Sequence, residues 1–375
     1  MKLIPNVFNK AHLEKQSEPF FIFYKKKLED RIEFFINNFD ANILYAVKAN
    51  PSKIVIKILA QNGIKSFDVA SLNEMKVVKK IIPDSHLFYM NPVKPRNFIR
   101  ESYFNFNVKD FAIDSLLELK KIEQETNYAK DIKIHLRIKL NSNNSFVDLS
   151  EKFGVEEKEA PKYLREISKQ NFKVGICFHV GSQCMNSKDF KSAIKKCKKI
   201  IHNSGVEVSS LDIGGGFPSS YPKFKQFSLS DYFKKIHKEF SELKEAFKFN
   251  IKLYSEPGRS IVSDCMSLIV RVDLKKNNRL FINDGIYGFL NNAGFREFNY
   301  HVKLFNRIDN VSKLKPFRFF GPTCDSADFM KGPFYLPSSV KEGDWIEIKQ
   351  MGAYSITMKT DFNGFFEKPQ IYLDK

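Results

Sequence analysis

Short apolar runs alternate with charged segments of helical length along the first two thirds of the chain, and this alternation limits the fold more than any other feature of the sequence. The runs are rich in β-branched and aromatic residues, which is typical of strands. Strands that alternate with helices form a parallel sheet, and about eight such units within about 240 residues predict a closed (β/α)8 barrel of the TIM type. The strand-like runs cover residues 44–48, 66–71, 86–90, 111–113, 132–140, 173–180 and 208–213, and the helical segments include 54–61, 72–82, 116–125, 160–169 and 188–203.

The sequence changes in character after Glu256. Beyond this residue, short strand-like segments are separated by Gly, Pro, Asn and Asp, and long amphipathic segments are scarce, which is typical of antiparallel β structure. A chain of 375 residues also exceeds what one hydrophobic core usually spans. We therefore predict a barrel domain over residues 19–255 and a second, mainly antiparallel β domain over residues 256–375 together with residues 1–18.

The composition restricts the partners and the compartment of the protein. The five cysteines form no CxxC pair, which argues against a disulfide framework and a zinc site, and no metal is expected. No window approaches 18 uninterrupted apolar residues, and the N-terminal region lacks the apolar core of a secretion signal, so we expect a cytoplasmic protein without a membrane partner. The net charge is +18, but the lysines are spread over the chain without an arginine-rich run, so nucleic-acid binding is not expected.

A single lysine, Lys48, ends the apolar run of residues 44–47. An apolar strand can deliver its last side chain into a buried site, where burial lowers the pKa of a lysine toward the range in which the free amine is a nucleophile. Such an amine can hold a carbonyl compound as a Schiff base. Alternatively, Lys48 is the solvated end of a strand in a chain rich in lysine.

Three consecutive glycines, Gly214, Gly215 and Gly216, follow another apolar run. Without Cβ atoms, their peptide N–H groups can converge on one anion, usually a phosphate, and barrels commonly bind phosphate after a strand. The segment is neither a GxGxxG fingerprint nor a Walker A loop, which disfavours dinucleotides and nucleoside triphosphates. The alternative is a tight turn with no ligand.

Three further segments carry reactive side chains, two of them near predicted strand ends. Glu256 could face a cationic ring nitrogen while Arg259 clamps a phosphate, or the two could form an ordinary surface ion pair. His179 could be a catalyst or a satisfied structural histidine. The thiol of Cys324, beside Asp325 in a loop with Gly and Pro, could be a general acid or a buried small side chain.

Nine segments in order resemble the fold-type III pyridoxal-phosphate-dependent decarboxylases, the group of ornithine, lysine and diaminopimelate decarboxylases, and resemble ornithine decarboxylase most. Each segment alone is weakly specific, whereas nine in the family's order are highly specific. The resemblance covers nearly the whole chain and implies an alanine-racemase-like pair of a barrel and a β domain, with pyridoxal 5'-phosphate as the cofactor. The segments read YAVKANP (45–51), FDVAS (67–71), YMNPVKP (89–95), HVGSQ (179–183), DIGGGFP (212–218), EPGRSIV (256–262), DGIYG (284–288), GPTCDSAD (321–328), and MGAY (351–354) with FNGF (362–365).

The resemblance implies a role for each matching residue. Lys48 resembles the lysine that binds the cofactor covalently, and Glu256 resembles the glutamate that keeps the pyridine nitrogen protonated. His179 matches the histidine that stacks on the pyridine ring. Cys324 resembles the thiol that protonates the carbanion after CO₂ has left. The implied cofactor-binding positions are Lys48, Asp68, Arg137, His179, Ser182, Gly214, Gly215, Gly216, Glu256, Arg259 and Tyr354.

The resemblance also implies a homodimer with shared active sites, because the neighbouring subunit supplies Cys324 and Asp325 in this family. Asp325 and Tyr287 match substrate-binding positions. Ornithine decarboxylases carry an acidic residue a few positions after DGxYG, and Glu297 could take this place here. The adjacent Arg296 could instead favour a substrate with a distal carboxylate.

The expected reaction is decarboxylation of a basic L-amino acid, most simply ornithine to putrescine in polyamine biosynthesis, with lysine or arginine as further candidates. The alternative is a decarboxylase of a carboxylated substrate, of the meso-diaminopimelate or carboxynorspermidine type. The Gln that ends HVGSQ favours the diaminopimelate branch, whereas the Thr-Cys-Asp loop and the MGAY and FNGF pair favour the ornithine branch. A third class is a non-catalytic homologue that binds a regulator, and the presence of Lys48, Glu256, Arg259 and Cys324 argues against it.

Overall fold

The computed structural model divides into two compact units. The barrel unit comprises Ile32–Ser219 and Gln226–Ser260, and the β unit comprises Met1–Arg31, Ser220–Lys225 and Ile261–Lys375. Within these units the structure describes residues 2–3, 13, 15–140, 145–147, 152–222, 224, 227–295, 298–305, 307, 309, 311–365 and 369–374.

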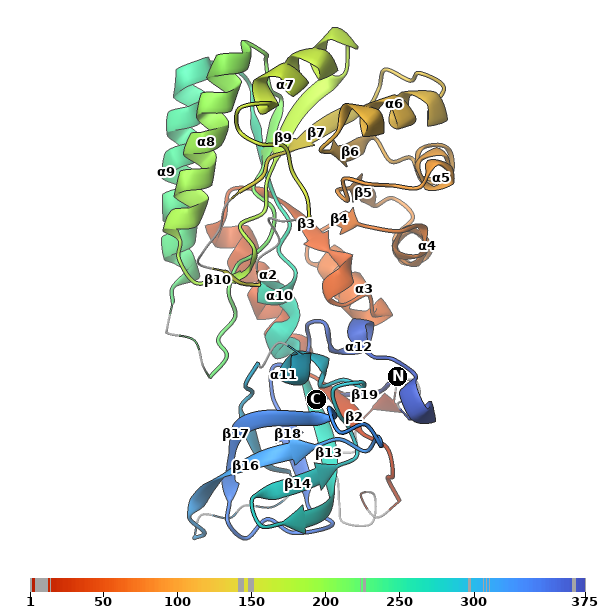
Figure 1. Cartoon of the computed structure of the whole chain (residues 1–375), viewed down its shortest axis with the longest axis vertical. Coiled ribbons are helices and arrows are strands. Elements are labelled where there is room, and N and C mark those ends of the chain that lie inside the picture. Colours follow the sequence, from red (N-terminus) through yellow and green to blue (C-terminus); the bar gives the residue numbers. More distant parts are fainter. Residues whose placement is uncertain are drawn as a thin grey trace. The chain divides into compact units, whose positions relative to one another are not determined.

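Eight parallel strands close into a barrel, which confirms the predicted fold class (Figure 1). Around the barrel the strands follow the order β11, β12, β3, β4, β5, β6, β7 and β9, and pairing of β9 with β11 closes the ring. Most of their residues are buried, because parallel strands in such folds are covered on both faces. The strands are β3 (Asn42–Ala46), β4 (Ser66–Val69), β5 (His86–Tyr89), β6 (Asp110–Ile113), β7 (Lys133–Arg137), β9 (Lys173–Cys177), β11 (Ser210–Asp212) and β12 (Lys252–Ser255).

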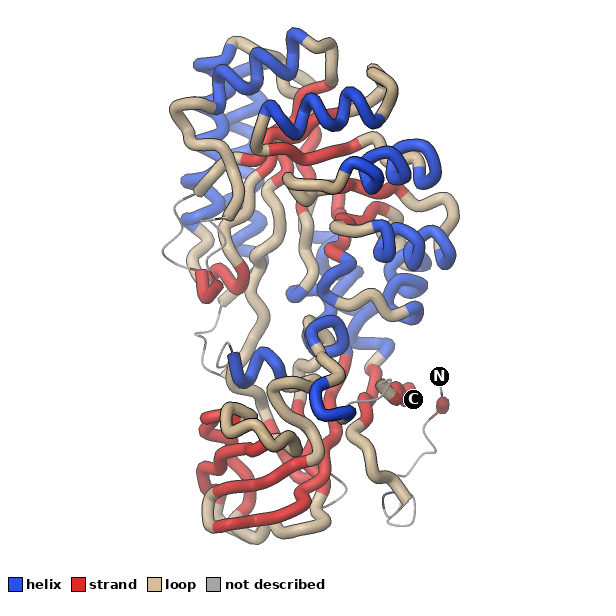
Figure 2. Tube along the Cα trace, turned by 45° about the vertical axis from the view of Figure 1, so that its right-hand side comes forward, coloured by secondary structure: helices blue, strands red, loops and turns tan. Residues whose placement is uncertain are grey.

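Helices cover the outside of the barrel (Figure 2). Local sequence fixes several helix ends. The hydroxyl of Ser71 accepts the N–H of Glu74, and the Glu74 carboxylate accepts the N–H of Ala70, which is a reciprocal cap at the start of α4. Gly205 ends α8 in a left-handed conformation. The helices are α2 (Lys25–Asn38), of which the second half belongs to this unit, α3 (Lys53–Gln61), α4 (Leu72–Ile81), α5 (Arg96–Phe106), α6 (Leu116–Glu125), α7 (Ala160–Lys169), α8 (Lys188–Ser204) and α9 (Leu229–Phe247).

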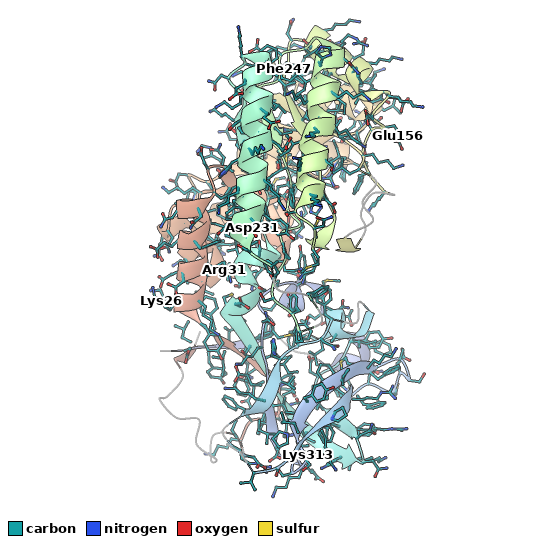
Figure 3. The ribbon with its side chains drawn as sticks, turned by 90° about the vertical axis from the view of Figure 1, so that its left-hand side faces the viewer. Lys26, Arg31, Glu156, Asp231, Phe247 and Lys313 are labelled. Atoms are coloured by element: carbon teal, nitrogen blue, oxygen red, sulfur yellow. The ribbon has the colours of Figure 1, made fainter. Side chains whose placement is uncertain are left out.

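Apolar packing fills both the inside and the outer layer of the barrel unit. Outside, α8 and α9 lie side by side, with Asp231 and Phe247 near the two ends of α9 (Figure 3). The rings of Phe39 and Phe233 stack 4.3 Å apart and join the end of α2 to α9. Inside, a buried cluster contains residues from five strands and one strand-end loop, namely Leu44, Phe88, Met90, Ala112, Cys177 and Tyr254.

The β unit contains a mixed sheet in which most of the described strand pairings are antiparallel. The long central strand β13 pairs with β2, β14 and β18 and thereby connects these three strands in one sheet. The apolar run of β2 lies in this sheet, where it pairs with β13 and β19. The strands are β1 (Lys2–Leu3), β2 (Phe20–Phe23), β13 (Met266–Lys276), β14 (Arg279–Ile282), β15 (Val302–Phe305), β16 (Leu314–Phe320), β17 (Phe329–Pro337), β18 (Trp345–Ile348) and β19 (Gln370–Leu373).

Among the helices that the structure describes, none combines the length and the apolar character needed to cross a membrane.

Candidate active site

Lys48 lies immediately beyond the end of β3, in the short 3₁₀ turn Val47–Ala49. Its Nζ atom is 2.6 Å from Oδ2 of Asp68, at the neighbouring strand β4. The sequence left open whether this lysine is buried or solvated; its side chain is 46% exposed, whereas that of Asp68 is 3% exposed. The chain turns after Ala46, so that the buried partner is the carboxylate and the amine rests on it.

The segment after β12 packs against this turn. A Cβ atom at Gly258 would lie only 2.8 Å from Cβ of Ala49, and the N–H of Ala46 donates to the carbonyl of Pro257 at 3.4 Å. This close approach requires glycine, because any larger residue would push the two segments apart. It fixes the buried side chains of Glu256 and Arg259 in the loop that borders the Lys48 turn.

The three glycines form a turn at which several backbone segments meet. Gly214 and Gly216 have φ of +65° and +94°, and a Cβ atom on either would lie 2.4 Å from a carbonyl oxygen, that of Phe178 or Gly181. The backbone therefore turns tightly at these glycines, a geometry that is compatible with the predicted phosphate site and with its alternative, a turn without a ligand. The N–H of Gly214 donates to Oδ1 of Asp212 at 2.8 Å. Within the described residues, no acceptor receives the N–H groups of Gly215 and Gly216, which leaves two donors for an anion.

His179 follows β9 and lies against the glycine turn. Its Nδ1 accepts the N–H of Gly181 at 2.9 Å, which places the single proton of a neutral ring on Nε2. Burial lowers the pKa of His179 well below its ordinary value, and the positive charges of Arg137 and Lys48 lower it further. The imidazole is therefore neutral at neutral pH, and a Cβ atom at Gly215 would lie 3.3 Å from its Nε2.

Buried carboxyl groups accumulate beside the lysine. Burial, followed by the charges of Asp212 and Asp68, raises the pKa of Glu256 well above its ordinary value, and Lys48 and Arg137 oppose this shift. Burial also raises the pKa of Asp212, to about 6. A cation beside such carboxyl groups is favourable, because it compensates the negative charge that burial and mutual repulsion otherwise disfavour. A protonated ring nitrogen next to Glu256 would supply such a cation, so the donor set fits a pyridine ring carrying a phosphate.

Gln183 fastens the glycine turn to the loops around it. Its amide donates to the carbonyl of Ser219 at 2.6 Å and accepts the N–H of Ser219 at 3.0 Å, while the Ser219 hydroxyl donates to the carbonyl of Arg259 at 3.3 Å. Ser182, predicted as a phosphate ligand, is half-buried at the start of β10 (Ser182–Cys184). In the sequence, Gln183 indicated only the substrate branch, and its structural role was not predicted. The sequence indicated this role only through the position of Gln183, directly after the predicted phosphate ligand Ser182.

Three loops of the β unit hold the remaining predicted residues. Cys324 is exposed, with its Sγ 3.5 Å from Oδ1 of Asn363. The hydroxyl of Tyr287 donates to the Asp325 carboxylate, and its ring lies 4.6 Å from that of Phe362. The segments DGIYG, GPTCDSAD and FNGF, which are distant in sequence, are thus brought together.

Asp328 supports these loops and was not singled out from the sequence. Its carboxylate is buried and accepts the N–H groups of Ile286 and Thr323 and the hydroxyl of Thr323. A Cβ atom at Gly285 or Gly321 would lie 2.2 Å from its Oδ1, so both loops need glycine to reach it. Its signal was present, since Asp328 ends the GPTCDSAD segment.

The other predicted positions are distributed as follows. Arg137 is half-buried at the end of β7 in the barrel unit. Tyr354, in the β unit, has a φ of +63° and precedes α12 (Ser355–Met358). Arg296 and Glu297 lie outside the described residues.

Comparison with known proteins gives a consistent result. A family model described as "Pyridoxal-dependent decarboxylase, pyridoxal binding domain" matches residues 25–263. The lysine/ornithine decarboxylase of Selenomonas ruminantium is 29% identical over 366 residues, which cover 95% of this chain and 90% of that protein. Antizyme inhibitor 2 of Xenopus laevis is 31% identical over 358 residues, covering 88% and 75%. The crystal structure of the arginine decarboxylase of Paramecium bursaria Chlorella virus superposes with a TM-score of 0.86 at 28% identity, over 97% of this chain and 98% of that chain.

Proposed function

The chain belongs to the family of pyridoxal-dependent decarboxylases, and we propose that within this family it decarboxylates a basic L-amino acid, preferentially ornithine, to give putrescine. Lysine and arginine are the next candidates, since related proteins carry the names of decarboxylases of all three amino acids. We place the reaction in the cytoplasm and in polyamine biosynthesis. The observation that carries the proposal is the ion pair of Lys48 with Asp68 beside the buried carboxyl group of Glu256.

The barrel unit offers groups for both ends of pyridoxal 5'-phosphate. Gly215, Gly216, Ser182 and Arg259 would hold the phosphate, while Lys48 would hold the aldehyde carbon. Glu256 would face the ring nitrogen and His179 would cover the ring. When bound, the cofactor supplies an electron-withdrawing ring that accepts the electron pair left by CO₂.

The residues of the barrel unit prepare this chemistry through charge. Asp68 fixes the position of the Lys48 amine by a 2.6 Å contact. Glu256 retains a proton in the cofactor-free chain, because its pKa is raised, and it can share this proton with a ring nitrogen. His179 is neutral and covers the ring without adding a positive charge, which would compete with protonation of the ring nitrogen.

The β unit would supply the acid and the substrate contact. The exposed thiol of Cys324 can deliver a proton to the substrate Cα after CO₂ has left. The N–H of Ala327 and the hydroxyl of Tyr287 lower the pKa of Asp325, which stays ionised and can meet a distal ammonium group. We propose that both residues act in the site of a second copy of the chain, so that a homodimer is required.

The ionised Asp325 also separates the candidate substrates. The distal carboxylate of meso-diaminopimelate would be repelled by it, whereas the ammonium group of ornithine or lysine would be attracted. A carboxynorspermidine-type substrate also ends in an ammonium group, so Asp325 does not discriminate against it. We retain the carboxylated substrates as the alternative, which Arg296 and the Gln that ends HVGSQ favour. A non-catalytic role is the third candidate, and antizyme inhibitor 2 is a relative for which a decarboxylase name is not used.

A substrate panel tests the proposal. Purified protein with pyridoxal 5'-phosphate is incubated separately with ornithine, lysine, arginine and meso-diaminopimelate, and CO₂ and amine products are measured. Putrescine from ornithine at the highest kcat/KM is expected. Lysine formed from diaminopimelate without putrescine from ornithine would establish the alternative, and protein that remains colourless and releases no CO₂ would establish the non-catalytic role.

A further inference from the structure

Ser255, the last residue of β12, is fully buried beside the glycine turn. Its hydroxyl donates to the carbonyl of Gly214 at 3.0 Å. A buried hydroxyl is costly unless it is hydrogen-bonded, and alanine would fill the end of a buried strand without this cost. What the serine adds at this position is therefore the hydrogen bond to the glycine turn.

The carbonyl of Gly214 is held by two donors from the same strand end. Besides the Ser255 hydroxyl, it accepts the N–H of Glu256 at 2.9 Å. The N–H of Gly214 is bound as well, because it donates to Oδ1 of Asp212 at 2.8 Å. Both polar backbone groups of Gly214 are thus fixed, which leaves the peptide units on either side of it little freedom to rotate.

The peptide unit between Gly214 and Gly215 transmits this constraint to the anion site. The unit is planar and trans, so its C=O and N–H groups point in opposite directions. With the carbonyl directed at the end of β12, the Gly215 N–H points away from that strand. No acceptor within the described part of the chain receives this N–H, which is one of the two donors left for an anion. A hydrogen bond to the carbonyl also polarises the unit and makes its N–H a stronger donor.

We propose that Ser255 is a positioning residue for the phosphate of the cofactor: through the Gly214 carbonyl, its hydroxyl sets the direction and the donor strength of the Gly215 N–H. Because the N–H of Glu256 binds the same carbonyl, the hydroxyl also fixes this phosphate donor relative to the residue that would face the ring nitrogen. The inference rests on the proposed function only where it names the anion as the phosphate of pyridoxal 5'-phosphate.

The alternative is that the hydroxyl only stabilises the fold, and the chain offers a matched control for it. Ser102 in α5 is also fully buried, and its hydroxyl donates to the carbonyl of Ile99 at 2.8 Å. Ser255→Ala and Ser102→Ala each remove one buried hydrogen bond from a hydroxyl to a carbonyl. Urea denaturation should therefore show losses of stability of the same size, whereas only Ser255→Ala should affect phosphate binding.

The decisive measurement compares pyridoxal 5'-phosphate with pyridoxal, which lacks the phosphate. Absorbance titration of the cofactor-free protein gives the affinity for each compound. We expect Ser255→Ala to weaken binding of pyridoxal 5'-phosphate by about 5-fold, as for the loss of one neutral hydrogen bond, and to leave binding of pyridoxal unchanged. Ser102→Ala should change neither affinity. Equal weakening for both compounds, or unchanged binding of pyridoxal 5'-phosphate, in folded Ser255→Ala would overturn the inference.

Ser255→Cys keeps the test valid if Ser255→Ala does not fold. A thiol is close to a hydroxyl in size but is a weak donor. The ratio of the two affinities should therefore fall in the same direction by a smaller factor. A ratio equal to that of the wild type would contradict the role of the hydroxyl.

A second measurement reads the peptide unit itself. Residues 214–216 are the only consecutive glycines in the sequence, so in protein labelled with [1-¹³C, ¹⁵N]glycine only Gly215 and Gly216 have a labelled carbonyl bonded to their nitrogen. A carbonyl-to-amide correlation spectrum then contains two signals. In Ser255→Ala the signal that joins the Gly214 carbonyl to the Gly215 amide should shift more than the other. If that signal does not shift, the inference alone is refuted.

Inorganic phosphate, added to the same labelled protein, separates the inference from the proposed function. The Gly215 signal of the wild type should move on titration, and Ser255→Ala should need about 5-fold more phosphate for the same displacement. A wild type that leaves pyridoxal 5'-phosphate unbound but shows this response would refute the proposed function and leave the role of Ser255 standing. A Gly215 signal that responds to neither compound would refute both.

Discussion

The barrel unit and the β unit place their candidate functional groups in opposite surroundings. In the barrel unit, Glu256 and Asp212 are buried and their pKa values are raised, that of Asp212 to about 6, so both groups hold protons at a higher pH than free carboxyl groups do. In the β unit, Asp325 belongs to an exposed loop and its pKa is lowered, so it presents a fixed negative charge. Cys324 is exposed as well. The difference indicates a division of labour in which the barrel unit holds the cofactor and the β unit meets the substrate.

The largest expected effect is that of Lys48→Arg, which tests whether the cofactor is attached to the barrel unit. Arginine keeps the positive charge beside Asp68 but is not a nucleophile, so the ion pair survives while covalent attachment fails. We expect decarboxylation to fall by at least about 10³-fold and the visible absorption of the bound cofactor to disappear. Borohydride reduction followed by peptide mapping would locate the attached pyridoxyl group in the wild type.

Lys65→Arg is the matched control for this experiment. Lys65 is also paired with an aspartate, with its Nζ 3.0 Å from Oδ2 of Asp84, but both side chains are exposed. It should keep the absorption and the activity of the wild type. A Lys48→Arg protein that still carries pyridoxyl after reduction would contradict the assignment.

Cys324→Ala tests the other side of the comparison. If the β unit supplies only the acid, the variant should bind the cofactor with unchanged absorption while kcat falls by about 10²-fold, because general acid catalysis contributes rate and not cofactor affinity. Absorbance titration and single-turnover kinetics separate the two quantities. Loss of cofactor binding in Cys324→Ala would show that the division of labour between the units does not hold.

Mixing the two inactive variants tests whether the units of different subunits combine. In a dimer of Lys48→Arg with Cys324→Ala, one shared site contains both defects and the other contains neither. Random exchange of subunits should therefore restore about one quarter of the wild-type activity. Activity that stays at the level of the single variants would contradict a site shared between subunits.

The sequence predicted the barrel well because its signals are local. Strands and helices of the barrel can be recognised by the period of their apolar residues, and in this fold most strands pair with strands that are near to them in sequence. The glycine turn could also be predicted, because backbone segments approach Gly214 and Gly216 so closely that only glycine fits, and consecutive glycines are recognisable in a sequence. Charge was harder to predict. The half-exposed position of Lys48 depends on a 3₁₀ turn that no spacing of apolar residues indicates.

The β unit shows why other parts escaped prediction. The run of β2 joins a strand that begins at Met266, and such distant pairing has no signal in either segment alone. Asp328 and Asn363 likewise act through contacts between loops that are far apart in sequence.

A smaller effect is expected from Gly214→Ala, which measures how tightly the barrel unit interlocks its backbones. The new Cβ atom would meet the carbonyl of Phe178 at 2.4 Å in addition to the strain of φ +65°. We expect the free energy of unfolding to fall by about 3 kcal/mol, measured by urea denaturation. Gly205→Ala is the matched control, because Gly205 has the same φ of +65° but nothing within 4 Å of an added Cβ atom, and it should lose about 1 kcal/mol. Equal losses in the two variants would show that backbone contact at the site is not important.

The smallest expected effect is a pH dependence of stability in which Asp212 and Asp325 act with opposite sign. The pKa of Asp212 is raised to about 6 in the folded chain, above its ordinary value of about 3.9 in an unfolded chain. Between these values the native state keeps a proton that the unfolded state has lost, so raising the pH across this window destabilises the cofactor-free barrel unit, by roughly 1–3 kcal/mol. Glu256, whose pKa is also raised, acts in the same direction. Asp325 acts in the opposite direction, because its pKa is lowered in the folded chain. It stabilises the fold at pH values above its pKa in the unfolded chain, and this stabilisation is lost as the pH falls through its pKa in the folded chain.

Two probes can read the units separately. Trp345, the single tryptophan of the chain, lies in β18 and reports on the β unit by fluorescence, whereas far-ultraviolet ellipticity is dominated by the helices of the barrel unit. From about pH 4 to about pH 6, the urea midpoint of the wild type, measured by ellipticity, should fall relative to that of Asp212→Asn, because the variant lacks the titrating group. Pyridoxal 5'-phosphate should reduce the contribution of Glu256 in the same way, since a cationic ring nitrogen lets Glu256 ionise without penalty. Identical pH profiles for the wild type and Asp212→Asn would mean that the buried Asp212 does not store a proton, and the contrast between Asp212 and Asp325 would then rest on exposure alone.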